Sequence, residues 1–257
     1  MSSEIRRFTR VTVATAKTVA DWAMLTLHAL RIELGKSYRQ TIDLLSEMPG
    51  VFEEIDLTRL PHDTVLRDWF EKISTKTWRA FLRVSAEKRT GHAAIDSTGF
   101  DRDQPSRYYA QRAHYRVRSL KVTALVDVET LFVTDVHCTT TKKHDAKIGP
   151  QVARRNADDL LSLAADRAYD GKPFRDELRS YGVRPLIKHR IHNTLDFAHN
   201  ARMSSMGYNR RWMVETVFSS LKRTLGAAVR ARSWHLELRE MVLKCTVYNL
   251  RRSVRYP

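Results

Sequence analysis

The sequence has little of what marks secreted, disulfide-stabilised or membrane proteins. Its 257 residues include two cysteines, Cys138 and Cys245, which are too few for a disulfide framework or for a zinc site built from cysteine pairs. No apolar run approaches the roughly 18 residues of a membrane-spanning helix, and the segment MSSEIRRFTR has no apolar stretch of the kind found in a signal peptide. We therefore expect two buried thiols in a reducing compartment.

Acidic residues are scarce beside basic ones. The chain has 29 Asp and Glu against 45 Lys and Arg, a net charge of +16, and its last 58 residues hold 12 Lys and Arg against three Asp and Glu. A basic surface of this size favours a polyanionic partner, of which nucleic acid is the most common. The alternative is a solvated basic surface without such a partner.

Residues 1–90 are predicted to be helical. Residues 15–34 have mixed apolar spacing and few helix breakers, apolar residues recur at helical spacing in 37–48 and after Pro61, and Ser37 is a favourable N-cap. Short helices joined by tight turns, with Lys and Arg on their outer faces, suit a DNA-binding region of the helix-turn-helix kind. A plain helical subdomain is the alternative.

From residue 91 the pattern changes to short, β-rich runs. Residues 117–128 and 131–137 are predicted to be strands joined by a tight turn, and the short apolar runs HAAID and LSLAAD precede and follow them. The rest of the chain alternates between expected helices at 145–161, 171–182, 208–223 and 234–252, a strand at 183–189 and a polar stretch at 193–207. This order predicts an α/β domain with a mixed sheet.

Two of the short apolar runs end at an aspartate, Asp96 and Asp166. A strand end is a favourable place for a catalytic acid, because the sheet holds the side chain rigidly while solvent or substrate reaches it. The alternative for each is a turn former or a helix cap. That alternative is our interpretation of Asp170, which precedes a glycine and a helix.

The expected helix YNRRWMVETVFSSLKR contains a single acid, Glu215, among basic residues. At 3.6 residues per turn, four of its polar residues share one stripe beside the apolar face: Tyr208, Arg211, Glu215 and Lys222. Glu215 could therefore meet the two aspartates at the edge of the core. Three such carboxylates would suit magnesium, a hard cation that binds carboxylate and phosphate oxygens and serves phosphodiester chemistry in pairs. The alternative is an Arg211–Glu215 ion pair at i,i+4 on a solvated face.

Other candidates have weaker support. Asp145, which follows His144, is expected to cap a helix, with a phosphate or accessory catalytic contact as the alternative. Asp135 lies in an alternating run and is expected to face solvent. Trp212 and Trp234 are expected in the core, with stacking on a nucleic-acid base as the alternative.

The polar stripe matches a known signature. The spacing Tyr208-x2-Arg211-x3-Glu215-x6-Lys222 resembles the Y-x2-R-x3-E-x6-K signature of a large group of prokaryotic insertion-sequence transposases, which are DDE enzymes with a ribonuclease H-like catalytic core. The segments IDSTGF and ADRAYDGKPFRDEL resemble the family's two aspartate segments, and YNLRR resembles its usual last helix. The resemblance covers about residues 91–252, while the N-terminal helices are similar only in general character.

This resemblance implies a fold and a set of site residues. The fold is α/β, a ribonuclease H-like mixed sheet flanked by helices and preceded by an all-helical N-terminal region. Residues 1–90 would bind DNA, and residues 91–257 would form the catalytic domain. The implied ligands of two Mg²⁺ ions, for which Mn²⁺ can substitute, are Asp96, Asp166 and Glu215. The implied DNA contacts are Tyr208, Arg211 and Lys222.

The implied activity is metal-dependent cleavage and transfer of DNA strands at the ends of an insertion sequence. The implied partners are double-stranded DNA, both terminal inverted repeats and target, and a second copy of the chain in a homodimer. We thus expect a cytoplasmic, nucleoid-associated protein. Only 49 residues separate Asp166 from Glu215, which leaves little room for the large insertion that some relatives carry. Two alternatives stay open, a DNA-binding protein without catalysis and another ribonuclease H-like nuclease.

Overall fold

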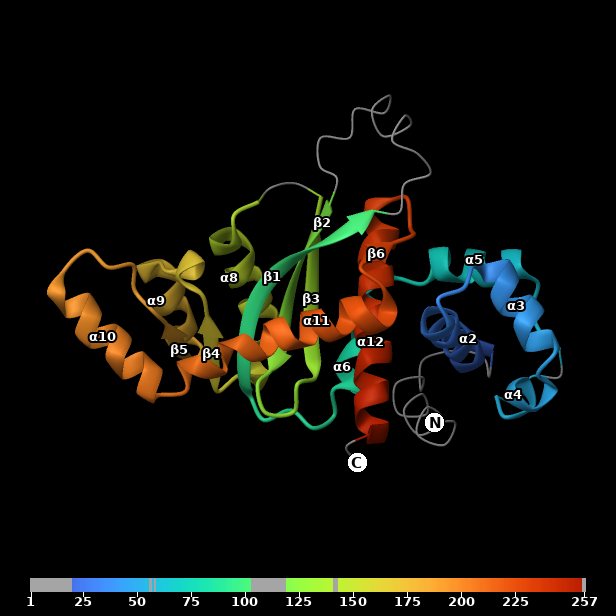
Figure 1. Cartoon of the computed structure of the whole chain (residues 1–257), viewed down its shortest axis with the longest axis horizontal. Helices are drawn as coiled ribbons and strands as arrows, with labels where there is room; N and C mark the ends of the chain where they lie inside the picture. The colour runs from blue at the N-terminus through green and yellow to red at the C-terminus, as the bar shows by residue number, and fades with distance from the viewer. Residues whose placement is uncertain (1–19, 56, 58, 103–118, 141–142, 256–257) are drawn as a thin grey trace, which may run out of the picture. The chain divides into compact units, whose positions relative to one another are not determined.

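Figure 1 shows the computed structural model of the protein, which describes residues 20–55, 57, 59–102, 119–140 and 143–255. The chain divides into two compact units, Met1–Ser85 with Arg239–Pro257, and Ala86–Leu238. Residues 239–257 thus group with the N-terminal helices, although the sequence pattern assigns them to the region that begins at residue 91. In the part of the chain that the structure describes, no helix has the length and apolar character needed to cross a bilayer.

The first unit is built from short helices, as the sequence predicts. They are α2 (Ala20–Leu34), α3 (Tyr38–Ser46), α4 (Pro49–Glu53), α5 (Asp63–Lys72) and α6 (Thr75–Ser85), together with most of α12 (Trp234–Arg255). The predicted N-cap, Ser37, forms a capping box. Its hydroxyl accepts a hydrogen bond from the amide of Gln40, and the Gln40 side chain accepts one from the amide of Ser37.

The C-terminal part of α12 is joined to this unit by side chains that no local pattern reveals. Two nitrogens of Arg251 donate to the carboxylate of Glu33 in α2, at 2.6 and 2.5 Å. Asn249 Nδ2 donates to the hydroxyl of Ser85 at the end of α6, at 2.9 Å. These contacts explain why the end of the chain belongs to the helical unit.

The core of the helical unit encloses a histidine. His28 is fully buried, and its ring stacks on that of Trp69 with the centroids 5.3 Å apart, while Trp78 meets it edge-on. Burial and then the positive charge of Arg31 lower the pKa of His28 to about 3, against an opposing backbone hydrogen bond at Leu66. The imidazole is therefore neutral in the folded protein at neutral pH.

The second unit is a six-stranded mixed sheet with helices on both faces. Its strands are β1 (His92–Arg102), β2 (Ser119–Asp127), β3 (Val133–Thr139), β4 (Ser162–Ala165), β5 (Arg184–Ile187) and β6 (Ala228–Val229). The order is β3-β2-β1-β4-β5, with β6 paired to the end of β1. The first three strands are antiparallel neighbours, whereas β4 and β5 run parallel to β1. The helices are α8 (Asp145–Asn156), α9 (Lys172–Ser180), α10 (Thr194–Ser205) and α11 (Met213–Leu225), with the 3-10 turns η1 (Ala157–Asp159), η2 (Arg167–Tyr169) and η3 (Tyr208–Trp212).

The two faces of β1 carry different chemistry, because successive side chains of a strand point to opposite sides. Ala93 and Ile95 belong to the apolar core formed with α8 and α9. Asp96 and Thr98 lie on the other face, toward α11, where Lys222 donates a hydrogen bond to Thr98 at 2.8 Å. Figure 1 shows α11 crossing in front of β1. The alternation thus separates a polar face from the core within one strand.

Asp96 lies within a strand and not at its end, which corrects the sequence-based expectation. β2 pairs with β1 as far as Asp101, so the strand continues through the whole of the segment IDSTGF. The parallel neighbour β4, however, pairs with β1 only up to Ile95, which lies opposite Ala165. Asp96 therefore lies at the position where β4 ends, beside Asp166, the residue that follows β4.

Two further segments differ from their predicted structure. The polar stretch 193–207 contains a helix, α10, because Asn193 and Asp196 form a capping box at its start. The predicted single helix 208–223 is divided: its first five residues form the 3-10 turn η3, and α11 begins at Met213. Neither difference follows from apolar periodicity.

Two sequence-based burial predictions have opposite outcomes. Cys138 and Cys245 are buried, as expected. Asp135 does not face solvent; it is 5% exposed, and its Oδ2 accepts hydrogen bonds from Arg155 and Asn156, each at 2.8 Å. Because α8 supplies both partners, this face of β3 is covered, and the predicted outward position is wrong.

Candidate active site

The signature residues Arg211 and Glu215 meet Asp96 of β1. Arg211 Nη1 lies 3.2 Å from Asp96 Oδ2, and Nη2 of the same guanidinium lies 3.1 Å from Glu215 Oε1. The i,i+4 pair that stood as the alternative is therefore present, but it is not an isolated surface pair. The Arg211 side chain is 22% exposed and bridges a carboxylate of the sheet to one of α11.

Asp166 reaches the same place from β4. It follows the last residue of that strand and caps η2, because its Oδ1 accepts a hydrogen bond from the amide of Arg167 at 2.6 Å. Burial raises the pKa of Asp96, and the negative charges of Asp166 and Glu215 add to that rise, while the Ser97 amide and Arg211 oppose it. Asp166 and Glu215, both far from Asp96 in the chain, thus act on it in the fold.

The carboxylates fit a divalent cation in their chemistry, although they are not arranged around one. Within the described ranges, no group of three His, Cys, Asp or Glu side chains is placed to hold a metal ion. Arg211 stands between Asp96 and Glu215 and balances their charge. Carboxylate oxygens are the ligands that magnesium prefers, and crowded negative charge is relieved by a cation. Joint binding of a metal by all three therefore requires Arg211 to move from between them.

The other two signature residues lie beside this group. Lys222 Nζ donates to Thr98, two residues along β1 from Asp96, and lies 5.2 Å from the ring centroid of Phe100. The half-buried ring of Tyr208 lies under Lys188, whose Nζ is 4.5 Å from its centroid. All four residues of the signature therefore border one polar region next to β1.

A second polar network lies on the opposite face of β1, around Asp145, which the sequence predicted only as a helix cap or an accessory contact. Ser97 Oγ donates to Asp145 Oδ1 at 2.5 Å and lies 2.7 Å from Thr123 Oγ1. Lys121 Nζ pairs with the same Asp145 oxygen at 2.9 Å, and the Tyr169 hydroxyl donates to it at 3.4 Å. The network holds β1 at the residue next to the first carboxylate. The acid at the start of α8 was the one sequence signal for it.

Gly149 of α8 leaves room for the buried ring of Tyr169 in this network. A β-carbon at Gly149 would lie 2.7 Å from Cδ1 and 2.9 Å from Cε1 of the tyrosine. We expect Gly149→Ala to lower the free energy of unfolding by about 1–3 kcal/mol, the usual range for overpacking, despite the roughly 1 kcal/mol that alanine gains over glycine inside a helix. Thermal unfolding followed by circular dichroism measures the change.

Gly50→Ala is the matched control for that substitution. Gly50 also lies in a helix, α4, and a β-carbon there would meet nothing within 4 Å. Its replacement should leave the unfolding temperature unchanged or raise it. If Gly149→Ala behaves in the same way, the tyrosine ring is free to shift and the packing argument is wrong.

Both tryptophans of the second unit lie at the surface. Trp212 is 53% exposed and Trp234 is 50% exposed, so the expectation of core packing is wrong. Trp212 directly follows Arg211 in η3, at the border of the carboxylate group. Base stacking therefore stays open as its role.

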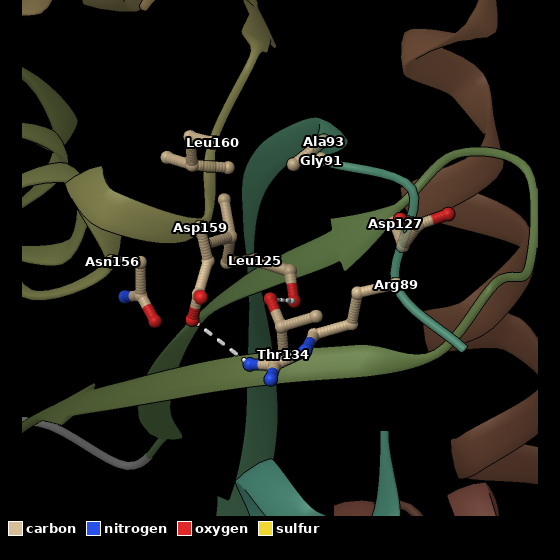
Figure 2. A pocket seen from close by; sticks show the side chains of 9 residues that line it. All are labelled: Arg89, Gly91, Ala93, Leu125, Asp127, Thr134, Asn156, Asp159 and Leu160. Atoms are coloured by element: carbon tan, nitrogen blue, oxygen red, sulfur yellow. Dashed lines mark hydrogen bonds and ion pairs between the residues drawn. The ribbon is translucent and has the colours of Figure 1, made fainter. Parts of the chain in front are cut away.

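A small pocket lies at the start of β1. Figure 2 shows the residues that line it, among them Gly91, just before the strand, and Asp127, at the end of β2. Arg89 and Asp159 in its lining form an ion pair at 2.9 Å. The lining includes neither the three candidate carboxylates, Asp96, Asp166 and Glu215, nor the other signature residues, so this pocket is separate from the candidate site.

Comparisons with known proteins agree with the geometry. A family model described as "Transposase DDE domain" matches residues 87–250. The cryo-EM structure of a piggyBac transposase synaptic complex with hairpin DNA has a similar fold, with a TM-score of 0.51 and 10% sequence identity, covering 99% of this chain and 73% of that chain. None of the curated protein sequences matches the chain.

At 10% identity the solved structure shows the fold alone. It confirms the expected ribonuclease H-like arrangement, a mixed sheet flanked by helices with a helical N-terminal region. The activity is instead inferred from the match to the family model, which spans well over half of the chain. The protein therefore belongs to the family of DDE transposases, enzymes that cleave DNA and transfer its strands in metal-dependent reactions.

Proposed function

We propose that Asp96, Asp166 and Glu215 are the catalytic, metal-binding residues of this transposase, and that the metal is a pair of Mg²⁺ ions for which Mn²⁺ can substitute. The observation that carries the proposal is the contact of one guanidinium with Asp96 and Glu215, together with the effect of Asp166 on Asp96. Bound magnesium would supply activation of the attacking oxygen and stabilisation of the leaving oxygen in phosphodiester cleavage.

Arg211 has two roles in this proposal. In the structure it balances the charge of two carboxylates. A guanidinium also binds phosphate through two parallel hydrogen bonds, so during the reaction Arg211 exchanges these carboxylates for a phosphate of the DNA. Lys222 supplies a mobile positive charge on the same face of β1, and the Tyr208 ring contacts the strand end.

The substrate in this proposal is double-stranded DNA, both the terminal inverted repeats of an insertion sequence and the target. The net charge of +16 supports a polyanionic partner, and the transposase of similar fold was solved in a synaptic complex with DNA. Residues 1–90 bind the repeats, residues 91–257 carry the catalysis, and two copies form a homodimer that brings two ends together. The protein acts at the nucleoid, in the cytoplasm.

Incubation with a labelled duplex that carries the DNA flanking the coding region tests the function. With Mg²⁺ or Mn²⁺ we expect strand breaks at defined ends and joining of the cut 3′ ends to a second DNA, and with a chelator neither. Binding without cleavage under all conditions would favour a DNA-binding protein without catalysis. Cleavage without joining would favour a plain ribonuclease H-like nuclease.

A further inference from the structure

Three basic residues gather beside the candidate active site, at the carboxyl ends of β4 and β5. Asp166 directly follows β4, and Lys188 directly follows β5. Because the last residues of these two strands are paired, Asp166 and Lys188 are neighbours at one edge of the sheet. Arg167 is the next residue after Asp166. Arg190 Nε donates to the carbonyl of Arg167 at 3.4 Å, which joins the two segments into one patch.

Ion pairing distinguishes this patch from many other arginines of the same unit. Eight of them pair with a carboxylate: Arg89, Arg102, Arg154, Arg155, Arg175, Arg179, Arg210 and Arg211. Within the residues that the structure describes, Arg167, Lys188 and Arg190 have no such ion pair, and Lys188 instead lies over the ring of Tyr208. Positive charge that the fold does not neutralise remains available to an external anion.

The loop after β5 is held from two sides. Asn200 of α10 accepts a hydrogen bond from the amide of His189 at 2.8 Å and donates one to its carbonyl at 3.1 Å, and its side chain is buried. Asp170 accepts one from the amide of Arg190 at 2.8 Å, while it also pairs with Arg175. This loop therefore presents its cations from a fixed backbone, which lowers the ordering cost of binding a ligand.

We propose that Arg167, Lys188 and Arg190 form a phosphate-binding patch that holds the backbone of a DNA strand on the Asp166 side of the active site. The proposal rests on the proposed function, because it takes DNA as the polyanion. Contacts to phosphate orient a strand without reading its sequence. The patch therefore sets where the strand lies relative to the carboxylates, and Asn200 acts as a positioning residue behind it.

The salt dependence of DNA binding by the full chain tests the patch. With a labelled duplex carrying the DNA that flanks the coding region, we expect Lys188→Gln and Arg190→Gln each to reduce the slope of log K against log salt by about 0.9, and to weaken binding about fivefold near physiological salt. Lys188→Arg should bind as the wild type does. Asn200→Ala keeps every cation and should still weaken binding, since the loop loses its anchor.

Arg179→Gln is the matched control, because it removes one exposed arginine that pairs with Asp176 on α9. It should leave the slope unchanged, and thermal unfolding should show all variants folded. If Lys188→Gln and Arg190→Gln keep the slope of this control while the wild type cleaves DNA, the patch is refuted and the proposed function stands. If their slopes fall but the wild type never cleaves with Mg²⁺ or Mn²⁺, the patch stands and the catalytic proposal is refuted.

Discussion

Replacement of Asp96 by asparagine is expected to abolish strand cleavage while DNA binding persists. The substitution keeps the shape of the side chain but removes the negative charge that a divalent ion requires of its ligand. We expect the cleavage rate at saturating DNA to fall about 10³-fold or more, which corresponds to ~4 kcal/mol in the activation barrier. Asp166→Asn and Glu215→Gln should show losses of the same order.

A carboxylate outside the group provides the control. Asp176 lies on α9 and pairs with Arg179 at the surface, so Asp176→Asn should cleave DNA at the wild-type rate. Full activity of any one of the three variants would remove that residue from the catalytic set. Loss of DNA binding together with cleavage would instead point to a folding defect.

Metal binding to the same three residues has a readout that needs no DNA. Addition of Mn²⁺ or Mg²⁺ at about 100 times the dissociation constant should stabilise the wild type by about 2.7 kcal/mol, seen as a higher unfolding temperature. The Asp96→Asn variant should lose most of this shift, whereas Asp176→Asn should keep it. Equal shifts in both would place the metal at another site.

The helical unit is expected to lose stability as the pH falls, because of His28. Its pKa is about 3 in the folded protein, against an ordinary value of 6.5, so the unfolded chain binds the proton first. The stabilising contribution is complete above pH 6.5 and is lost progressively as the pH falls toward 3. At about 1.4 kcal/mol per pKa unit, the loss between pH 7 and pH 4 is ~3 kcal/mol. Urea unfolding followed by tryptophan fluorescence, to which Trp69 beside the imidazole contributes, measures it.

His28→Leu should remove this part of the pH dependence, because leucine has a similar volume and no titratable group. His62→Asn is the control in the same unit, since His62 is exposed and its cap of α5 can be made by asparagine. That variant should follow the wild-type pH profile. Parallel profiles of His28→Leu and the wild type between pH 7 and pH 4 would show that the histidine is protonated without cost.

Local sequence patterns predicted the structure correctly where a feature depends on residues of a single helix or strand. Local patterns predicted helices where α2, α3, α5 and α6 lie, and they predicted the N-cap at Ser37 because capping involves residues three apart. The short helix α4 was not among the predicted ones. Tyr208, Arg211, Glu215 and Lys222 border one polar region, as their spacing predicted, although the first two lie in a 3-10 turn and not in an α-helix. These features depend on residues that are close in the chain.

Predictions were wrong where a distant neighbour decides the outcome. β1 continues past Asp96 because β2 pairs with it, and Asp135 is buried because α8 covers it with Arg155 and Asn156. The partners of Asp145 come from β1, β2 and η2. No window of sequence contains both sides of such contacts.

The amino-acid sequence by itself determined four features of this protein: its basic charge, the helices before residue 86, the four-residue signature, and two aspartates after apolar runs. The tertiary structure alone decided that Arg211 stands between Asp96 and Glu215, and that the side chains of Lys188 and Arg190 form no ion pair with a carboxylate among the described residues. The physical reason is that strand order and register bring together residues far apart in the chain. Which charges are neutralised and which stay available depends on those neighbours, and local propensity does not encode them.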